Sequence, residues 1–507
     1  MLALTGAPLT VAEFCDYYKE RGLQQRHPRF GAKLDPTNTY FLSPKPHEAT
    51  SQSDGQQQEA LFDEDDVYRH VKEIFFPMVY RTELKALIDD AITQPLNLLE
   101  GLWQVRIATG GKIGQSGALS QARLKDESES HTGSKEHVES LLMFRSHHCM
   151  ADGVSLSAIF TDLVDEAPEL HAQMQRLVQQ YKTARRKMQK SLWKRLLNLI
   201  RYWWLGTIMA VLHQCNLYLQ MLLTTTPWDL LEDDYFNDEK IKKGSSNRTK
   251  RTISWCEVAT VDQVKQVSKY FSNQSTQQHR FTINDIFASC VSAAIARLIE
   301  YHRQTKPHLP ISTMPHMNLV MPVHMQGGVL LPGQSLGNKI GAIVCRIPAE
   351  MHEDKGSDAS STSRQDRLRQ VHDRVFAIKQ TPAAILSYLT AKTFGYLGIG
   401  GGSPIDADGD TVMSWLFSKA HANASAVLTN VRGPDKPMHL GGRKIETTLG
   451  FLPLPPGIPV GVAVSSYAGN ITLSVTGEPW AVPDADLFLL WVVEEYQALL
   501  KQSLADQ

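Results

Sequence analysis

The feature that most constrains this chain is a repeated switch between two hydrophobic periodicities. In both halves, apolar runs of strand length alternate with segments whose apolar residues recur at helical spacing. This alternation is typical of a mixed α/β (α+β) architecture, in which helices cover β-sheets. The chain has 507 residues, of which 42% are hydrophobic, and this is enough for two packed domains of ordinary size.

A change in composition near the middle of the chain predicts where the two domains are joined. A basic run is followed there by a long uncharged stretch. We therefore predict an N-terminal domain at residues 1–180, a bridging segment at residues 181–247 and a C-terminal domain at residues 248–507.

The stretch Phe144–Ser155, FRSHHCMADGVS, carries the clearest chemical signal. Val138–Ser146 is predicted to be a strand and Val154–Val164 a helix, so the two histidines lie on the turn between them. Neighbouring side chains of an extended backbone point to opposite faces, so His147 and His148 are poorly placed to bind one metal ion. Either histidine alone is also typical of an ordinary hydrogen-bonded residue, but the complete HHxxxDG pattern favours a catalytic base. The ordinary pKa of an imidazole, about 6.5, makes its neutral form available at neutral pH.

The HHxxxDG pattern is shared by CoA-dependent acyltransferases and by the condensation domains of peptide synthetases, and other segments narrow the resemblance. Gln94–Ile107, QPLNLLEGLWQVRI, is similar to the PLxxxxPLWE segment of the bacterial-type wax ester synthase/diacylglycerol acyltransferase (WS/DGAT) family, and Phe281–Glu300 resembles that family's Asn-Asp helix. Further segments recur in the family's order: NLVMPVHMQ, LGNKIGAIVCRIP, LTNVRGPDKPMHLGGRKI and GVAVSSYAGNITLSV. The chain resembles this family from about Phe30 to Leu500.

Several positions depart from the family's pattern. Gln104 stands where the family has an acidic residue, Gly101 stands where it has proline, and Arg432 lies within NVRGP where the family has NVPGP. The family's opening strand also looks absent, because Thr10–Gly31 already resembles the helix that precedes PRF. These positions are expected to have supporting roles, so the departures do not exclude activity.

The resemblance implies two domains built like chloramphenicol acetyltransferase, each a mixed β-sheet flanked by helices, with an active-site tunnel between them. It also implies direct acyl transfer, in which His148 takes the proton from a fatty alcohol or diacylglycerol hydroxyl as the oxygen attacks an acyl-CoA thioester. Acyl-CoA is then a co-substrate, and no cofactor, metal ion or covalent enzyme intermediate is expected. His147 is expected to shape the site, and Asn284 is either an oxyanion donor or a helix N-cap.

The other candidate site residues have supporting roles. Asp152 is expected to hold an arginine or to cap backbone amides, and Gly153 is expected to permit the turn before the helix. The residues expected to bind substrate come from the matched segments: Pro95, Leu96, Trp103, Asp285, Asn430, Gly433 and Pro434.

Two other motifs are only weak evidence of function. Gly333–Gly337, GQSLG, fits the GxSxG pattern of a hydrolase nucleophile elbow, but Pro332 precedes it and a strand rather than a helix is predicted after it. Gly398–Gly402, GIGGG, lacks the strand-to-helix transition of a phosphate-binding loop. We interpret both as loops.

The bridging segment has a composition typical of membrane surfaces. Lys182–Arg201 contains eight Lys or Arg residues and no acidic residue, and Tyr202–Trp228 contains no charged residue but includes YWWLGTIMAVL. His213, Gln214, Asn216 and Gln220 interrupt the apolar stretch, so residues 182–228 are expected to dock on a membrane or lipid droplet rather than span a bilayer. The alternative is an interdomain helix whose apolar face is buried by protein.

The composition also limits partners and location. The formal net charge of -1 gives no global attraction to nucleic acid. The six cysteines form no CxxC pair, and the N-terminal residues lack the pattern of a secretory signal. We therefore expect a protein on the cytosolic side of the endoplasmic reticulum, another membrane or a lipid droplet.

Three classes of function are open at this stage. The first is a CoA-dependent O-acyltransferase that makes wax esters, triacylglycerol or both. The second is a condensation-type or polyketide-associated acyltransferase that uses a carrier-protein thioester, and the third is a non-catalytic lipid-droplet or membrane-binding protein. The intact histidines and the lack of a carrier-domain serine motif favour the first.

Overall fold

The structure is a computed structural model of the 507-residue chain. It describes residues 1–34, 41–42, 67–75, 78–79, 81–97, 100–109, 112–113, 138–147, 150–188, 199–223, 226–238, 250–274, 280–325, 337–349, 357–396, 424–454 and 457–505.

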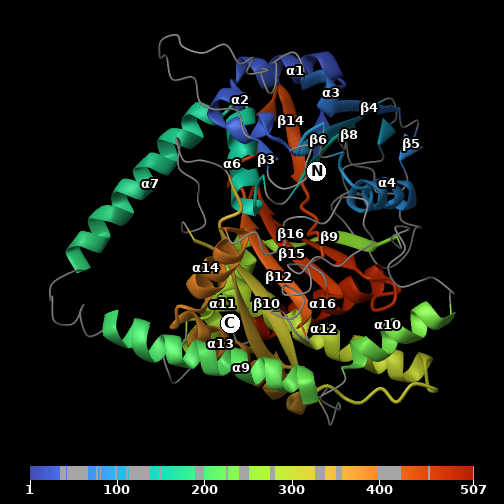
Figure 1. The fold of residues 1–507 in the computed structure, drawn as a ribbon, viewed down its shortest axis with the longest axis vertical. Coiled ribbons are helices and arrows are strands. Elements are labelled where there is room, and N and C mark those ends of the chain that lie inside the picture. The colour runs from blue at the N-terminus through green and yellow to red at the C-terminus, as the bar shows by residue number, and fades with distance from the viewer. Residues whose placement is uncertain are drawn as a thin grey trace.

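Two mixed β-sheets form the body of the protein, one above the other in Figure 1. The upper sheet has the order β13 (His439–Leu440), β14 (Arg443–Thr448), β1 (Leu2–Thr5), β8 (Val138–Ser146), β6 (Trp103–Thr109) and β4 (Val71–Phe75), with β7 (Lys112–Ile113) joining β8 to β5 (Met78–Val79). The lower sheet has the order β11 (Ile340–Pro348), β10 (His316–His324), β12 (Ala424–Arg432), β15 (Val460–Tyr467), β16 (Asn470–Gly477) and β9 (Thr252–Thr260). A separate pair joins β2 (Lys33–Leu34) and β3 (Phe41–Leu42).

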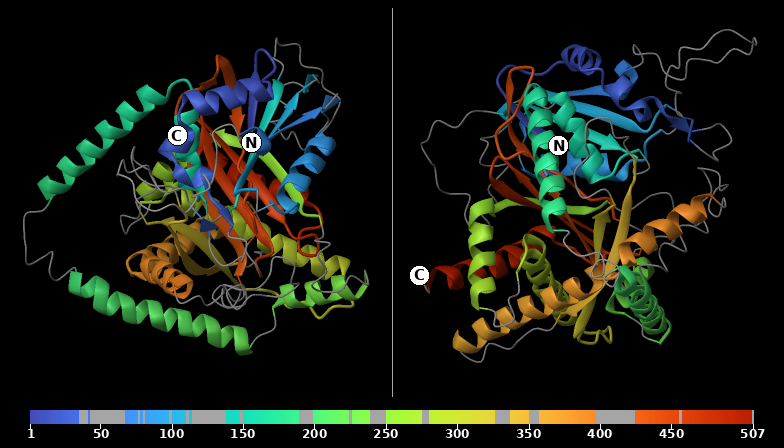
Figure 2. Two further views of the ribbon diagram at one scale, coloured as in Figure 1. Left: turned by 45° about the horizontal axis from the view of Figure 1, so that its top comes forward. Right: turned by 90° about the vertical axis from the view of Figure 1, so that its left-hand side faces the viewer.

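Helices flank both sheets (Figures 1 and 2). Those of the upper half are α1 (Val11–Glu20), α2 (Leu23–Arg26), a 3₁₀ turn (Pro28–Gly31), α3 (Val67–His70), α4 (Arg81–Thr93), α6 (Gly153–Leu163) and α7 (Ala167–Met188). Those that follow are a π-helical turn (Arg201–Leu205), α9 (Gly206–Leu223), α10 (Pro227–Asp238), α11 (Val261–Gln274), α12 (Ile283–Thr305), α13 (Ser357–Lys379), α14 (Ala383–Tyr396) and α16 (Ala485–Ala505). The predicted α/β class with two mixed, helix-flanked sheets is confirmed.

The alternation of side chains along the strands of the lower sheet separates its two faces. In β10, Leu319 and Met321 pack into the main core with residues of α11, α12, α13 and α16, whereas Val320 faces the opposite side. On that opposite side Val320 packs with Leu217 of α9. The period of two in the strand therefore decides which helices cover each face.

The upper sheet is completed by strands from the far end of the sequence. Strand β1 lies between β8 and β14, with Leu4 opposite both Ser140 and Ile445. All four residues of β1 are buried, so its side chains contribute to the core on both faces. The expectation that the opening strand is absent is therefore wrong, because the short run LALT before Thr10 forms it.

Three hydrophobic clusters account for most of the packing beyond the lower core. One packs α1 and α6 on the upper sheet, and a second packs α9 against the lower sheet. The third joins the two halves, because Leu84 and Ile88 of α4 pack with Ile253 and Trp255 of β9. Within the described residues, none of the helices is long and apolar enough to cross a bilayer.

Candidate active site

The HHxxxDG motif lies where the sequence predicts it, between a strand and a helix. Strand β8 ends at Ser146, and the His147 backbone N–H donates to the carbonyl oxygen of Leu102 at 2.7 Å. The Met150 N–H donates to the His147 carbonyl at 2.9 Å, which turns the chain towards α6. His148 itself lies outside the described residues, so its catalytic role stays a prediction.

Asp152 fixes the start of α6. Its carboxylate accepts hydrogen bonds from the backbone N–H of Ser155 at 2.8 Å and from that of Lys339 at 3.0 Å. The first bond is a helix N-cap, so the predicted capping role is confirmed. The second ties the motif to the segment before β11, which belongs to the other half of the protein. The side chain of Asp152 is fully buried, so both bonds are shielded from water.

His324 is a second side chain close to this carboxylate. Its Nε2 lies 3.4 Å from Asp152 Oδ2, and its side chain is only 6% exposed. Burial lowers the pKa of His324 below its ordinary value, while the charge of Asp152 opposes that shift. The expected arginine partner is thus replaced by a histidine at the end of β10.

The far end of α6 is held by a second buried carboxylate. Asp162 accepts hydrogen bonds from His27 Nε2 at 2.6 Å and from the guanidinium of Arg26 at 3.2 Å, and His171 Nε2 lies 2.7 Å from it. Burial opposes the ionisation of Asp162, but the hydrogen bond from His27 and the surrounding positive charges hold its pKa below its ordinary value. Helix α6 is therefore fixed at both ends.

Two helix N-termini meet the end of strand β12. A Cβ atom on Gly153, the first residue of α6, would lie 3.1 Å from Cγ2 of Val431. One residue earlier in β12, the Asn430 side-chain amide donates to Oδ1 of Asn284 at 2.7 Å. Asn284 lies in the first turn of α12, so the structure brings the HHxxxDG helix and the Asn-Asp helix to adjacent residues of one strand.

The structural roles of Gly153 and Asn284 differ from those that the sequence suggests. The backbone φ of Gly153 does not lie in the left-handed region, so this glycine is needed for the close approach of Val431 rather than for a turn. The N-cap of α12 is Thr282, and the alternative that Asn284 is the N-cap is wrong. Because Asn430 donates to the oxygen of Asn284, the Asn284 nitrogen is the end that remains able to donate.

Asp285 lies beside Asn284 but faces the interior. Its carboxylate accepts hydrogen bonds from the N–H and hydroxyl of Thr282, both at 2.8 Å, and completes a capping box. Its Oδ2 atom also lies 3.0 Å from Nδ1 of His372 on α13. Asp285 is therefore packed between α12 and α13 with 2% of its surface exposed, away from the Asn284–Asn430 pair.

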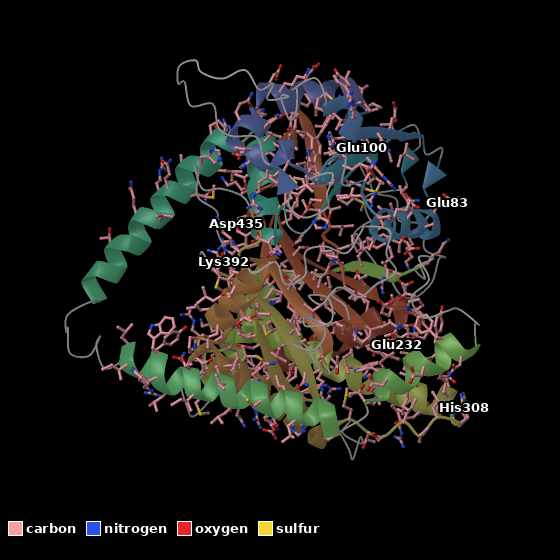
Figure 3. The ribbon with its side chains drawn as sticks, in the orientation of Figure 1. Glu83, Glu100, Glu232, His308, Lys392 and Asp435 are labelled. Carbon is pink, nitrogen blue, oxygen red and sulfur yellow. The ribbon has the colours of Figure 1, made fainter. Side chains whose placement is uncertain are left out.

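The NVRGP segment comprises the last three residues of β12 and the two residues that follow it. The Gly433 N–H donates to the Ser466 carbonyl at 2.9 Å, and a Cβ atom on Gly433 would lie 2.4 Å from that oxygen. The Pro434 carbonyl accepts a hydrogen bond from Ala468 at 2.9 Å. Arg432 is exposed and pairs with Asp435 at 2.9 Å, in the part of the molecule between the two halves (Figure 3). The arginine that replaces the family's proline therefore points into solvent.

The segment around Trp103 forms a wall of the upper half. Trp103 is 2% exposed, and its indole N–H donates to the Phe30 carbonyl at 2.9 Å. The His70 ring stacks on it with a centroid distance of 4.5 Å, and a Cβ atom on Gly101 would lie 2.4 Å from that ring. A side chain at position 101 would therefore clash with the imidazole.

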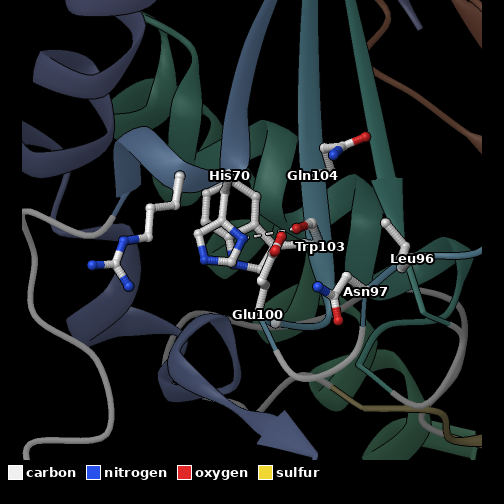
Figure 4. Close-up of a pocket in the computed structure, with 8 residues that line it drawn as sticks. His70, Leu96, Asn97, Glu100, Trp103 and Gln104 are labelled. Carbon is white, nitrogen blue, oxygen red and sulfur yellow. Dashed lines mark hydrogen bonds between the residues drawn. The ribbon is translucent and has the colours of Figure 1, made fainter.

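A small pocket opens beside this wall (Figure 4). It is lined by Arg69, His70, Leu96, Asn97, Glu100, Gly101, Trp103 and Gln104. Leu96 and Trp103 thus contribute to one pocket, whereas Pro95 is exposed next to it. The pocket does not include Asn284 or Asn430, so the structure divides the expected substrate-binding residues between two places.

Gln104 stands at the point where the family has an acidic side chain. Its Oε1 accepts hydrogen bonds from Arg106 at 3.1 Å and from Arg145 at 3.0 Å. Burial, followed by the neighbouring charge of Arg106, lowers the pKa of Arg145 to about 10. The uncharged Gln104 amide therefore accepts a hydrogen bond from each guanidinium group but does not neutralise their positive charges.

Other motifs and residue clusters add little to the site. In the GQSLG motif, Gly337 is described and Ser335 is not, and the segment is followed by strand β11, as predicted. The GIGGG run lies outside the described residues. In the described part of the chain, no group of three or more His, Cys, Asp or Glu side chains is arranged to hold a metal ion.

The sequence analysis missed His324, Ser155 and Lys339 as members of the site. Ser155 Oγ donates to the Gly337 carbonyl at 3.1 Å, beside the bond from Lys339 N–H to Asp152. His324 does carry a sequence signal, because it is a polar residue at the end of the apolar strand run MNLVMPV. Its proximity to Asp152 is a long-range contact that no local pattern encodes.

One solved structure is similar in its architecture. The chain is similar to the trichothecene 15-O-acetyltransferase TRI3 from Fusarium sporotrichioides, with 11% identity over 98% of this chain and 89% of that chain and a TM-score of 0.50. It also aligns with a wax ester synthase/diacylglycerol acyltransferase from Marinobacter aquaeolei VT8, with 14% identity over 99% of this chain and 93% of that chain and a TM-score of 0.46. No curated protein matches the sequence.

The sequence of the C-terminal part gives a more specific match. Residues 336–500 match the WS/DGAT C-terminal domain. This match includes the Lys339 loop, strands β11 and β12 with Asn430, and the NVRGP segment. Residues 336–500 of this chain therefore form a WS/DGAT C-terminal domain.

Proposed function

We propose that this protein is a CoA-dependent O-acyltransferase that transfers a long-chain acyl group from acyl-CoA to a fatty alcohol, to diacylglycerol or to both. The products are wax esters and triacylglycerol, and His148 is the general base. The observation that carries the proposal is the meeting of two helix N-termini, those of α6 and α12, at Val431 and Asn430 of β12.

The proposed reaction is a single displacement through a tetrahedral intermediate. His148 removes the hydroxyl proton as the alcohol oxygen bonds to the thioester carbonyl carbon, and the negative charge moves to the carbonyl oxygen. Collapse of the intermediate breaks the carbon–sulfur bond, and the thiolate of CoA takes the proton from the imidazolium. The products are one ester and one free thiol, and the histidine returns to its neutral form.

The N-terminal turns of α6 and α12 supply electrostatic support for the negative intermediate. The N-terminus of a helix carries a partial positive charge, which stabilises an anion placed within about one turn of it. Asn284 lies in the first turn of α12, and its amide nitrogen is a donor for the developing oxyanion. Asn430 contributes by holding the Asn284 oxygen and so orienting that amide.

The test is an assay of the purified full chain with palmitoyl-CoA and either hexadecanol or dioleoylglycerol. Release of free CoA thiol and formation of ester are measured together. His148→Ala should lower kcat by about 10²–10⁴-fold, as expected for loss of a general base, and His147→Ala should lower it less. His308→Ala is a matched control, because His308 is exposed and pairs with Asp234 far from β12 (Figure 3).

Three outcomes would overturn the proposal. Full ester formation by His148→Ala would show that His148 is not the general base. Thiol release without ester formation would indicate hydrolysis of the thioester. Transfer from an acylated carrier protein, with none from acyl-CoA, would place the protein with the condensation-type enzymes.

A further inference from the structure

The segment from Leu199 to Leu219 exposes an unusual amount of apolar surface. Fourteen large hydrophobic side chains are exposed in the described part of the chain, and ten of them lie in this segment. Their exposed fractions range from 42% for Trp203 to 71% for Trp204. We name this set the outer face: Leu199, Ile200, Trp203, Trp204, Leu205, Ile208, Met209, Val211, Leu212 and Leu219.

The opposite side of the same helix is fixed to the protein. Leu217 is 1% exposed and packs with Val320 and Val344 of the lower sheet. His213 Nε2 lies 2.7 Å from the Val344 carbonyl, and a Cβ atom on Gly206 would lie 2.9 Å from Pro382. Because these contacts hold one side of α9 against the protein, rotation of the helix cannot bury the outer face.

Helix α9 is apolar on both sides, and this indicates that its outer side contacts something other than water. A surface helix of a water-soluble domain is normally polar on its outer side, and a helix that is apolar all round needs a second apolar environment. Figure 1 shows α9 along an outer edge of the molecule, and Figure 3 shows side chains projecting from it beyond that edge. The outer face therefore lacks the polar residues that water would favour.

The residues before the outer face indicate which environment covers it. Eight Lys or Arg residues and no acidic residue lie in Lys182–Arg201, and Tyr202, Trp203 and Trp204 follow them directly. Basic side chains attract anionic phospholipid headgroups, and aromatic side chains favour the boundary between headgroups and acyl chains. A partner protein with an apolar surface would not account for this one-sided charge.

The structure also fixes how such a surface is contacted. Helix α9 has 18 residues, and no helix in the described part of the chain can cross a bilayer. Since its inner side is attached to the lower sheet, α9 can approach lipid only with its axis in the plane of the surface.

We infer that the outer face docks this protein on an anionic phospholipid surface, with its apolar side chains among the acyl chains. The basic residues that precede it in the sequence favour anionic headgroups. The docking is independent of the proposed chemistry, since it uses no residue near Asn284 or Asp152. It would bring the enzyme to the phase in which long-chain alcohols and diacylglycerol dissolve.

The test is flotation of the full chain with vesicles of phosphatidylcholine alone or with phosphatidylserine added. The wild-type protein should float with the anionic vesicles and be released by high salt. Leu212→Asp places a charge in the outer face and should weaken binding by about tenfold or more. Leu504→Asp is the matched control, because Leu504 on α16 is similarly exposed, 52% against 60% for Leu212, and it should float like wild type.

A second variant tests the electrostatic part. Replacing Lys182, Arg185, Arg186 and Lys187 by glutamine should remove most of the preference for anionic vesicles and leave weak binding to phosphatidylcholine unchanged. His148→Ala should float like wild type, so failure of the proposed catalysis and failure of docking are separate results.

Two outcomes would overturn the inference. One is equal flotation of Leu212→Asp and wild type while both variants of the matched pair retain the wild-type melting temperature. The other is a wild-type dimer in size-exclusion chromatography that Leu212→Asp converts to a monomer, without binding of either form to vesicles. That result would assign the outer face to a second copy of the chain.

Discussion

The N-termini of α6 and α12 are built alike but are connected differently to the rest of the protein. Each contains a buried aspartate that caps the helix and lies near a histidine: Asp152 with His324, and Asp285 with His372. Asp285 has its partners on α12 and α13, within one core. Asp152 also accepts a hydrogen bond from Lys339 and thereby joins the upper half to the lower half.

This difference indicates that the N-termini of α6 and α12 have different structural roles. The capping box of α12 holds Asn284 in place through contacts within a single hydrophobic core. The start of α6 instead depends on contacts from both halves, so the position of the HHxxxDG motif is sensitive to how the halves fit together. The following substitutions address each side of this comparison, from the largest expected effect to the smallest.

Replacing Asn284 tests whether the N-terminus of α12 takes part in catalysis. Asn284→Ala should lower kcat by about 10²–10³-fold, as expected when one oxyanion donor is removed, with little change in stability. Asn430→Ala should cause a smaller loss, because Asn430 contacts the Asn284 oxygen rather than supplying the donor. Steady-state kinetics at saturating acyl-CoA measure both. An unchanged kcat for Asn284→Ala would mean that the start of α12 has only a structural role.

Removing the Asp152 carboxylate tests the link between the halves. Asp152→Ala loses a helix cap and leaves the Lys339 N–H without its acceptor, and together these should lower the free energy of unfolding by about 2–4 kcal/mol. Urea unfolding measures this loss. Trypsin should also cut faster after Lys339 in Asp152→Ala but not in Asp285→Ala, whose carboxylate does not contact that segment. Equal cleavage in the two variants would contradict the comparison.

Two glycines beside β12 test how closely each element approaches the strand. Gly433→Ala should lower the free energy of unfolding by about 1–3 kcal/mol, because its Cβ atom would meet a backbone oxygen at 2.4 Å. Gly153→Ala should cost less than about 1 kcal/mol, since the Val431 methyl group 3.1 Å away can shift. Thermal and urea unfolding of both variants measure the difference. A larger loss for Gly153→Ala would show that α6 is held more rigidly against β12 than these contacts indicate.

The pH dependence of stability tests the histidine beside Asp152. Burial lowers the pKa of His324, and also that of His302, below the ordinary value of 6.5. The unfolded chain then binds more protons than the folded protein just below that pH, so stability rises with pH through this interval and is lost as the pH falls. Melting temperatures at pH 7.5 and 5.5 measure this loss. His324→Gln should reduce but not abolish it, because His302 remains, and an unchanged pH dependence would exclude His324 as a contributor.

Local patterns predicted much of this protein. The strand before the histidines and the helix after them agree with their predicted limits to within one residue, and a strand follows GQSLG as predicted. These elements were accessible because their hydrophobic period of two or of about 3.6 is visible over a few residues. The capping role of Asp152 followed from its place one residue before a helix.

What the sequence did not reveal depends on contacts between distant residues. The N-cap of α12 is Thr282 rather than Asn284, and the difference arises from the reciprocal bond with Asp285. The four residues of β1 were too few to show a period, and the strand is stabilised by β8 and β14 on either side. His324 and Asp152 are likewise brought together by the packing of two halves.

The position of β1 between β8 and β14 bears on the synthesis of the protein. Leu2 pairs with Thr448, so one edge of β1 has no partner until β14, far later in the sequence, has been made. An exposed strand edge of this kind favours pairing with other chains. Nascent chains of this enzyme therefore pass through a long interval in which a chaperone that shields the first strand would increase the yield of native protein.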